Sequence, residues 1–482
     1  MAQTGHRDVI VLGAGIAGLN ALSVATDVLG PAGRALLVER RPQPGGMWND
    51  TYDYVRLHQP HGFFTAGNIP WTQGHPREHL ATRAEVLAHM AYCLEVCRSR
   101  SQVETRFGWE YVAHAEHDEL VEVTLRAPDG SLDTVTCDRL VKAFGYDVQA
   151  KPPFEVSSGA VRSISPNDHG MKTGAIARDQ APVWIIGGGK SGMDAALALL
   201  EEQPGRDVRM LVGGGTAFLS RDVWFPTGAR RWVATRPNQQ GIAYTLHFDG
   251  SNEEEVQQWL LRGSGLSPVD HPRDFLLGLM SRAEADTLRT GVAEFVKDYL
   301  VDVVDGPDGP LLQLRSGAQR PVPAGTWLVN CTGYLAREEI PYEPFVSASG
   351  RVVSINPRSA LTHLTTFASY FLTHALMRGL LPLPDLYEVD MVAGTKEAKA
   401  AGGVLALTAT LYNISVFFDA LPMSVFLNNR LDFDGWLPPA RVAAGSLRFM
   451  ATHHRVRARH RAALDAFGAR GIRSGPLSPD RA

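Results

Sequence analysis

Two glycine-rich segments have the residue types and spacing that suit binding of a dinucleotide pyrophosphate. In each, the first glycine permits a tight turn, the second lets main chain approach the phosphates, and the third allows close packing of helix on strand. These glycines are Gly13, Gly15 and Gly18 in the first segment, and Gly187, Gly189 and Gly192 in the second. Lys190 and Ser191 lie between the last two. Two such segments in one chain indicate two nucleotide ligands or a duplicated ancestor.

The elements around both segments suit this chemistry. Short apolar runs, typical of strands buried on both faces, precede the glycines at 8–12 and 182–186. Helical patterns follow at 19–29 and 195–202. A helix that begins there offers unpaired N–H groups and a partial positive charge to phosphates. We therefore expect an α/β fold with two Rossmann-like dinucleotide-binding domains and a helical C-terminal region.

An acidic residue follows the first segment at the end of a second predicted strand, 35–39. This residue, Glu39, is placed to accept hydrogen bonds from ribose hydroxyls. A glycine pair comes soon afterwards, where main chain can pass close to a ligand, and then a tryptophan that can cover a ring face. The residues concerned are Arg40, Gly45, Gly46, Met47 and Trp48.

Together these motifs resemble the FAD site of class B flavoprotein monooxygenases, the flavin-containing and Baeyer–Villiger type enzymes. In that family an acid followed by a GGxW segment contacts FAD. The second glycine segment, which ends in Asp194, resembles the GxGxSGxD motif of the family's NADPH site. The resemblance implies FAD at the first segment, with contacts from Glu39 to Trp48, and a pyridine nucleotide at the second. It covers most of residues 8–335.

The nicotinamide cofactor is less closely specified. The strand at 208–212 ends in three glycines and not in an acid, which would favour NADH by binding the 2′-hydroxyl. We therefore expect NADPH, with NADH as the alternative. The candidate cations for its phosphates are Lys190, Arg209 and Arg221.

Two further segments resemble the family's linkers between its domains. One contains Gly145, and the other contains Thr332 and Gly333. These linkers imply a discontinuous FAD-binding domain, about 1–150 and 335–482, with its C-terminal helices beside the substrate. An NAD(P)H-binding domain at 151–334 would carry a helical insertion at about 236–300, with helices at 253–262 and 282–299. Alternating residues at 102–137 predict a β-hairpin or a β-meander.

The predicted catalytic residues are His58 and Gln59, which precede Pro60. Many family members carry an Asn near this position, close to the flavin ring. The present segment looks more like the LxLHxP form of the YUCCA-type plant enzymes, which oxidatively decarboxylate a 2-oxo acid. Either side chain can donate a hydrogen bond, and a histidine also titrates near neutral pH. The residues before the second glycine segment match the family's Baeyer–Villiger fingerprint only in part.

The resemblance implies a monooxygenase reaction. NAD(P)H would reduce FAD, and O2 would then form a C4a-(hydro)peroxyflavin that transfers one oxygen atom to a small organic substrate. N- or S-oxidation is the leading reaction, followed by Baeyer–Villiger oxidation or oxidative decarboxylation. A non-oxygenating flavin oxidoreductase or NADPH oxidase is the alternative class, and a non-catalytic nucleotide-binding protein a third. A thioredoxin-reductase type is disfavoured because no CxxC occurs. No metal-ligand spacing is evident, and we expect no metal.

Composition excludes other classes. The 482 residues carry 47 basic and 51 acidic side chains, a formal charge of −4, which disfavours binding of nucleic acid. A basic helix at 453–473 is predicted to be solvated or to contact a second copy in a homodimer. The apolar stretch 402–418 is predicted to be a core helix, with no stable membrane insertion. Four cysteines and the lack of a signal-peptide pattern predict a cytoplasmic protein.

Overall fold

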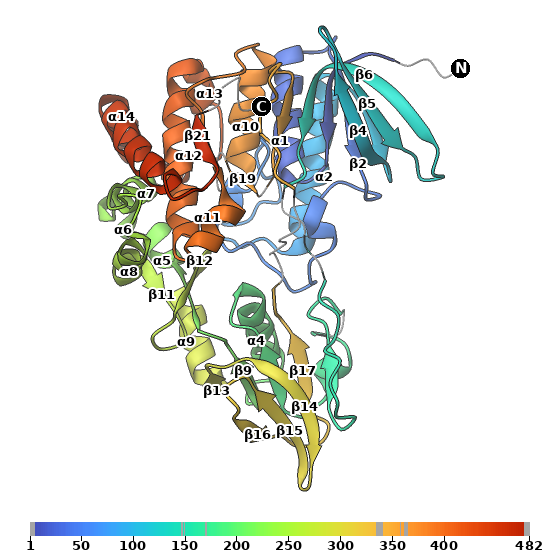
Figure 1. The fold of residues 1–482 in the computed structure, drawn as a ribbon, viewed down its shortest axis with the longest axis vertical. Coiled ribbons are helices and arrows are strands. Elements are labelled where there is room, and N and C mark those ends of the chain that lie inside the picture. The colour runs from blue at the N-terminus through green and yellow to red at the C-terminus, as the bar shows by residue number, and fades with distance from the viewer. Residues whose placement is uncertain are drawn as a thin grey trace.

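The computed structural model describes residues 5–145, 148, 150–168, 171–333, 341–356, 358–360 and 365–476. Its elements form two main sheets, which lie at opposite ends of the molecule, with helices around and between them (Figure 1). The α/β class expected from the sequence is confirmed.

The first sheet has seven strands in the order β3-β2-β1-β6-β5-β4, with β18 on the other side of β6. Its pairs β1–β2, β2–β3, β1–β6 and β6–β18 are parallel, and the meander β4–β5–β6 is antiparallel. The strands are β1 (Arg7–Leu12), β2 (Arg34–Glu39), β3 (Gln102–Phe107), β4 (Glu110–Glu116), β5 (Val121–Arg126), β6 (Leu132–Lys142) and β18 (Val352–Ser354). The sequence predicted β1, β2 and the antiparallel part of this sheet, but it placed 102–107 in the meander, whereas β3 pairs in parallel with β2.

Helices α1 (Ile16–Leu29), α2 (Arg83–Arg100) and α10 (Thr365–Met377) pack against one another beside this sheet. Helix α1 contacts both of the others, so the late segment α10 lies against the first glycine segment's own helix (Figure 1). Nearly all residues of the middle of α1 are buried, because small side chains let its neighbours approach closely.

The second sheet has five strands in the order β13-β9-β8-β17-β7, all parallel. Its strands are β7 (Arg162–Ile164), β8 (Val183–Ile186), β9 (Val208–Leu211), β13 (Val292–Val296) and β17 (Trp327–Asn330). Helices α3 (Ala175–Arg178), α4 (Lys190–Glu202) and α9 (Arg282–Gly291) accompany it. Each main sheet thus carries one predicted glycine segment between a central strand and its helix.

Three smaller sheets complete the strand structure. They contain β10 (Thr216–Ser220), β11 (Gly265–Leu266) and β12 (Asp274–Met280); β14 (Leu300–Gly306), β15 (Gly309–Leu314) and β16 (Gln319–Pro321); and β19 (Ser359–Ala360), β20 (Tyr387–Asp390) and β21 (Ser474–Pro476).

Among the remaining helices, α7, α8, α11, α12 and α14 form one packed group in which the predicted insertion meets the C-terminal region. Helix α12 contacts α7, α8 and α14, and α14 also contacts α7 (Figure 1). The remaining helices are α5 (Arg221–Trp224), α6 (Arg230–Val233), α7 (Pro237–Leu246), α8 (Glu253–Ser264), α11 (Met391–Glu397), α12 (Ala401–Ala420), α13 (Met423–Leu427) and α14 (Pro439–Gly468). The basic helix predicted at 453–473 corresponds to the second half of α14, which ends at Gly468, five residues earlier than predicted.

The prediction of one helix is wrong for the second half of its range. The pattern predicted a helix over 282–299, but α9 ends at Gly291 and β13 follows at once. Its first half has a capping box between Ser281 and Glu284. The β-branched and aromatic residues after Gly291 instead pair in parallel with β9, so sheet pairing overrides the helical pattern. The predicted helical insertion also contains a strand, β12.

Within the described part of the chain, α12 is the one helix long and apolar enough to cross a membrane, judged by length and composition. In the structure, 67% of its apolar window is buried. Since its neighbours are other helices of the same chain, α12 has the packing of a core helix, as the sequence predicted.

Candidate functional site

The first glycine loop is shaped by contacts within the protein. Gly13 has φ +100°, and a Cβ atom there would lie 2.5 Å from the Ala143 carbonyl oxygen. A Cβ at Gly18 would lie 1.8 Å from the Gly13 oxygen. At Gly15, by contrast, the nearest atom to an added Cβ is Gly46 Cα at 3.4 Å. The outer two glycines are therefore required by the fold, whereas the middle one is not.

The second glycine loop repeats this arrangement. Gly187 has φ +130°, and an added Cβ would lie 2.4 Å from the Cys331 carbonyl oxygen. A Cβ at Gly192 would lie 2.2 Å from the Gly187 oxygen. At Gly189 the nearest atom is Leu276 Cδ1, at 3.9 Å. Both middle glycines thus leave space that the protein itself does not need, as close approach of a phosphate requires.

The two helices that follow these loops begin without a side-chain cap, as α7, α12 and α14 also do. Helices α1 and α4 begin after Gly15 and Gly189, without a side-chain cap and without an acid in the first turn. Helices α2, α9 and α11 are capped by Thr82, Ser281 and Asp390. The first N–H groups of α1 and α4 therefore have no capping side chain as acceptor, which suits an anionic ligand.

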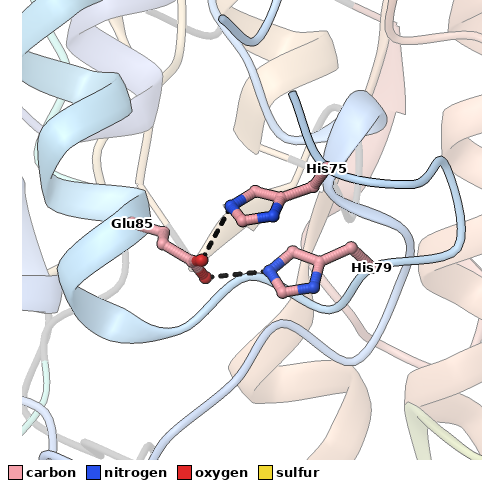
Figure 2. Close-up of side chains that lie close together, drawn as sticks. All are labelled: His75, His79 and Glu85. Atoms are coloured by element: carbon pink, nitrogen blue, oxygen red, sulfur yellow. Dashed lines mark hydrogen bonds and ion pairs between the residues drawn. The ribbon is translucent and has the colours of Figure 1, made fainter. Parts of the chain in front are cut away.

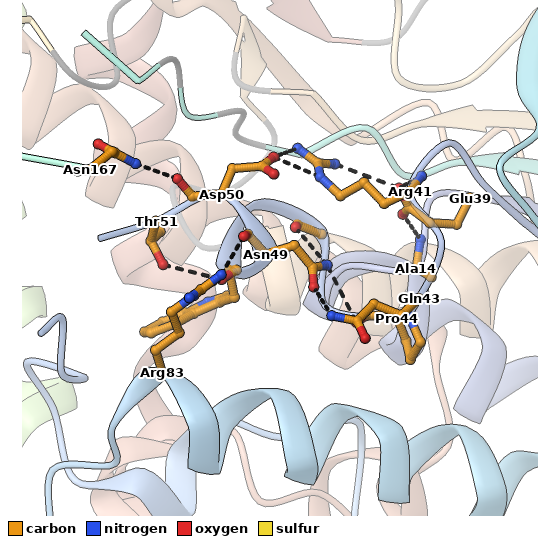
Figure 3. A network of polar contacts seen from close by, with 12 residues as sticks. Ala14, Glu39, Arg41, Gln43, Pro44, Asn49, Asp50, Thr51, Arg83 and Asn167 are labelled. Atoms are coloured by element: carbon orange, nitrogen blue, oxygen red, sulfur yellow. Dashed lines mark hydrogen bonds and ion pairs between the residues drawn. The ribbon is translucent and has the colours of Figure 1, made fainter. Parts of the chain in front are cut away.

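Glu39 lies at the edge of the first loop and is buried, with 4% of its surface exposed. Its Oε2 accepts a hydrogen bond from the Ala14 N–H at 2.7 Å, and its Oε1 accepts one from the Arg41 N–H at 3.0 Å (Figure 3). The Arg41 guanidinium lies 3.5 Å from Oε1. These donors hold the carboxylate beside the loop. Arg40 is exposed.

The glycine pair and Trp48 form a short 3-10 turn on the same loop. The Gly45 N–H donates to the Ala14 oxygen at 2.9 Å, and Gly46 has φ +52°. Arg83, at the start of α2, donates from Nε to the Trp48 oxygen at 2.8 Å and also bonds the Asn49 oxygen (Figure 3). Trp48 is buried and Met47 partly buried. Sequence reasoning assigned Arg83 no role, although the capping signature from Thr82 to Glu85 marks where α2 begins.

His58 lies in a segment that contacts strand β12 and helix α5. Its Nδ1 accepts a hydrogen bond from the Leu279 N–H of β12 at 2.8 Å. Its carbonyl oxygen accepts one from Arg221 Nε at 2.9 Å. Because Nδ1 is an acceptor, the neutral ring carries its proton on Nε2. Gln59 is half-buried, and no side-chain hydrogen bond is found for it among the described residues.

Tyr52 provides a second contact between the segment that follows the first site and the elements around the second site. Its hydroxyl donates to Asp194 Oδ2 at 2.8 Å, and Lys190 pairs with the same carboxylate. Burial, with the neighbouring Asp194 charge, raises the pKa of Tyr52 well above its usual value, so the phenol keeps its proton and stays a donor. The GGxW side of the first site is thereby tied to α4 through Asp194. Neither the role of Tyr52 nor that of Asp194 in joining the sites was evident from the sequence.

The chain shares this arrangement with a known family. Residues 7–248, half of the chain, match the family model described as pyridine nucleotide-disulphide oxidoreductase. The chain belongs to this family. The match agrees with the resemblance to class B flavoprotein monooxygenases and with a flavoprotein fold that has two dinucleotide domains.

Individual relatives are more distant. An uncharacterized protein of Mycobacterium tuberculosis is 30% identical over 216 residues, which cover 41% of this chain and 37% of that protein. The chain thus spans well under two thirds of that relative. A flavin-containing monooxygenase from Stenotrophomonas maltophilia is similar at 17% identity, over 73% of this chain and 90% of that one, with a TM-score of 0.45. A bacillithiol disulfide reductase from Bacillus cereus is similar at 14% identity, over 78% of this chain and 100% of that one, with a TM-score of 0.45.

The two arginines predicted to bind the cofactor phosphates, Arg209 and Arg221, each pair with acidic side chains of the protein. Arg209 pairs with Asp207 at 2.9 Å and with Glu294 at 3.5 Å. Arg221 is largely buried, and burial lowers its pKa, while Glu284 lies 2.5 Å away and offsets this effect. Both guanidinium groups thus already have carboxylate partners, and their contact with a cofactor stays a prediction.

Another cation lies at the end of β9, where the adenosine ribose of a pyridine nucleotide would lie in this fold. The Arg273 N–H donates to the Gly214 oxygen at 3.1 Å. Its side chain is exposed and has no ion-pair partner among the described residues. Arg273 was missed because it is far from Gly214 in sequence, and no local motif marks it.

The two predicted linkers follow equivalent strands. Gly145 follows β6 and has φ +54°, and Gly333 follows β17 and has φ +58°. The Gly145 N–H donates to the Ile355 oxygen at 3.0 Å, and the Thr332 hydroxyl donates to Asn330 at 2.7 Å. Cofactor contact by these residues stays a prediction.

The family's disulphide chemistry raises the question of the thiols. All four cysteines are free and buried. Burial raises the pKa of Cys93 to about 11 and that of Cys97 and Cys137 to about 12, and it also raises that of Cys331. Because the thiolate is the reactive form, none of these thiols suits disulfide exchange at neutral pH.

We expect a thiol-reactive disulfide reagent to label less than one thiol per chain in native buffer within minutes, and all four in denaturant. The readout is the absorbance of the released leaving group. Fast native labelling of a cysteine pair, accompanied by loss of NADPH oxidation, would instead indicate a redox-active dithiol.

Proposed function

We propose that the chain is an FAD-dependent, NADPH-consuming monooxygenase that transfers one oxygen atom from O2 to a small organic substrate, with N- or S-oxidation as the leading reaction. The observation that carries the proposal is the repeated glycine loop, which occurs once on each main sheet between a parallel strand and the helix that follows it. In this proposal, residues 1–150 and 335–482 bind FAD and residues 151–334 bind NADPH. Four buried free thiols support a cytoplasmic location.

The residues of the first glycine loop and those around it fit FAD. Main chain around Gly15 and Gly46 would receive the pyrophosphate, and the carboxylate of Glu39 would accept from a ribose hydroxyl. Gly13 and Gly18 would keep the loop tight enough for this approach. Bound FAD would supply the redox chemistry, accepting a hydride from NADPH and passing electrons to O2.

The chain's own residues would orient the two cofactors. Tyr52 and Lys190 hold Asp194 near the start of α4, and Tyr52 belongs to the loop that follows Trp48. His58 would present its Nε2 proton beside the reacting centre while Nδ1 is held by β12. Such fixed contacts preserve the orientation on which hydride and oxygen transfer depend.

The purified chain tests this function directly. We expect yellow protein with bound FAD and NADPH oxidation that is stimulated by a substrate. Oxygen uptake and peroxide release should be compared across amines, sulfides, ketones and 2-oxo acids. One product formed per NADPH with an amine or sulfide supports the proposal. Quantitative release of peroxide with every substrate class would favour an NADPH oxidase, and folded protein that cannot be reconstituted with flavin would refute both.

His58→Ala should lower the yield of product per NADPH about tenfold, because loss of a donor worth about 1.4 kcal/mol in the transition state changes a rate ratio by that factor. His58→Asn places an oxygen near the position of Nδ1 and should restore the Leu279 contact. If the contact to β12 is what matters, His58→Asn recovers most of the coupling. If both variants equal the parent protein, His58 has no role in the reaction.

Arg273→Ala should raise the KM for NADPH at least about tenfold and leave the KM for NADH unchanged. A charge-assisted hydrogen bond to a phosphate contributes about 1.5–3 kcal/mol, and NADH lacks the 2′-phosphate. Arg289→Ala, which removes an exposed arginine that pairs with Asp286, serves as control. Equal changes with both nucleotides would contradict the assignment of Arg273.

A further inference from the structure

Two histidines in the loop before α2 lie close to a glutamate in the first turn of that helix. His75 Nε2 lies 2.8 Å from Glu85 Oε1, and His79 Nε2 lies 2.9 Å from Glu85 Oε2 (Figure 2). Each ring nitrogen thus meets its own oxygen of one carboxylate. The two imidazoles stack, with ring centroids 4.0 Å apart and planes 19° apart. All three ligand atoms lie within 4.8 Å of one another.

The loop that carries the histidines is held in place by its own hydrogen bonds. The His79 oxygen accepts from the His61 N–H and faces His61 Nδ1, each at 3.1 Å. The His79 N–H donates to the Pro76 oxygen at 2.9 Å. The Gln73 side-chain amide donates to the main-chain carbonyl oxygen of Glu85 at 3.2 Å. These bonds hold the main chain that carries His79 and Glu85, which limits the reorganisation that ligand binding needs.

The charge of Glu85 is not balanced by a lysine or arginine among the residues that the structure describes. Its Oε2 also accepts from the N–H and hydroxyl of Thr82, which are neutral donors. The nearby Arg77 is turned to Trp436, with its guanidinium 4.2 Å from the ring centre and a hydrogen bond to the Trp436 oxygen. The site therefore combines one carboxylate with two imidazoles in a partly exposed position that an ion can reach.

A second cluster shows the contrast. Asp419 lies near His453 and His454, but Arg457 donates to Asp419 Oδ2 at 2.6 Å, and His453 Nδ1 contacts the Ser415 hydroxyl at 2.9 Å. Its carboxylate is already paired with a cation. This second cluster is a salt-bridge group, and it provides a matched control.

We propose that His75, His79 and Glu85 bind one divalent transition-metal ion, with Zn²⁺ the best match. Two imidazole nitrogens and a carboxylate oxygen, each about 2.0–2.2 Å from the ion, form a usual zinc donor set, and a fourth position stays open to water. The three ligand atoms already lie within 4.8 Å of one another. The sequence predicted no metal, because the ligands are spaced along an extended loop and a helix start without a common motif.

The ion would secure the start of α2. Glu85 is the capping-box residue of this helix, and Arg83 in the same turn holds the Trp48 and Asn49 oxygens. Metal binding would therefore fix the GGxW turn as well as the helix. The proposal does not depend on the chain being a monooxygenase.

Tag-free protein stripped with a chelator tests the site. We expect one Zn²⁺ per chain in a titration against a chromogenic chelator, a rise in Tm with Zn²⁺, and a visible Co²⁺ absorption band. His75→Phe keeps the ring stack but removes the nitrogen, so it should weaken Zn²⁺ binding at least about 100-fold, beyond the 10- to 100-fold effect of losing an outer-shell partner. His79→Ala should do the same, and His454→Ala in the control cluster should change nothing.

Two results would overturn the zinc site. One is the absence of stoichiometric Zn²⁺ binding to the parent protein, and the other is equal affinity in the parent protein, His75→Phe and His79→Ala. Circular dichroism establishes that each variant is folded, and His75→Phe, whose side chain stays partly exposed, is the variant least dependent on refolding of the loop. Colourless protein that still binds Zn²⁺ would refute the proposed function alone.

Discussion

Gly189→Val is expected to slow reduction of the flavin by NADPH at least about 1000-fold, while the protein stays folded and keeps its FAD. The nearest atom to a Cβ added at this position is Leu276 Cδ1, 3.9 Å away, so the folded chain can accept a side chain there. It would instead occupy the space through which main chain approaches the pyrophosphate. A loss of about 4 kcal/mol in productive binding corresponds to this factor. Anaerobic bleaching of the flavin absorbance measures it.

Two matched variants separate binding from folding. Gly192→Ala places Cβ 2.2 Å from the Gly187 oxygen and should destabilise the second sheet itself. Gly15→Val is the equivalent of Gly189→Val in the first glycine loop and should release FAD without unfolding the chain. Normal bleaching by NADPH in Gly189→Val would show that the second glycine loop does not bind the nucleotide.

Lowering the pH from 7 to 5 should cost about 4 kcal/mol of folding free energy through two buried histidines. Burial lowers the pKa of His374 to about 3 and that of His460 to about 4. In the unfolded chain each titrates near 6.5. Below that pH the unfolded state takes up protons that the folded state does not, so stability falls as pH falls towards the folded pKa values. Each histidine contributes about 2 kcal/mol at pH 5, a large share of a typical total of about 5–15 kcal/mol.

Urea unfolding at pH 7 and pH 5 measures this loss. His460→Leu should recover about 2 kcal/mol of the loss. The Thr245 hydroxyl, which contacts His460, also donates to the Gly241 oxygen at 3.0 Å, so it keeps a partner. His374→Leu should act in the same way, and the exposed His454→Ala should not. An unchanged pH dependence in the double variant His374→Leu, His460→Leu would disprove this origin.

The two glycine loops could be predicted because their chemistry is local. Gly13 and Gly187 need positive φ, and Gly18 and Gly192 need to lie against the preceding turn, so the residue type at each position is dictated within a few neighbours. The strands and helices on either side have apolar patterns that are readable over short windows. The family followed from these patterns, and the match to residues 7–248 confirms it.

Features that depend on distant partners could not be predicted in this way. Arg209 had the right type and position for a phosphate, but the structure pairs it with Asp207 and Glu294. The stretch after Gly291 had a helical pattern, but an open edge beside β9 made it a strand. Glu294 and the edge of β9 lie outside the window that a local pattern covers, whereas Asp207 lies only two residues from Arg209.

The sequence by itself therefore determined the fold class, the two glycine loops and the acid beside the first, because each depends on backbone conformation set by adjacent residues. Only the tertiary structure decided that His58 bonds β12, that Arg273 lies beside Gly214, and that His75 and His79 share the carboxylate of Glu85. These arrangements join segments by hydrogen bonds and charge, and such contacts leave no periodic pattern in the chain.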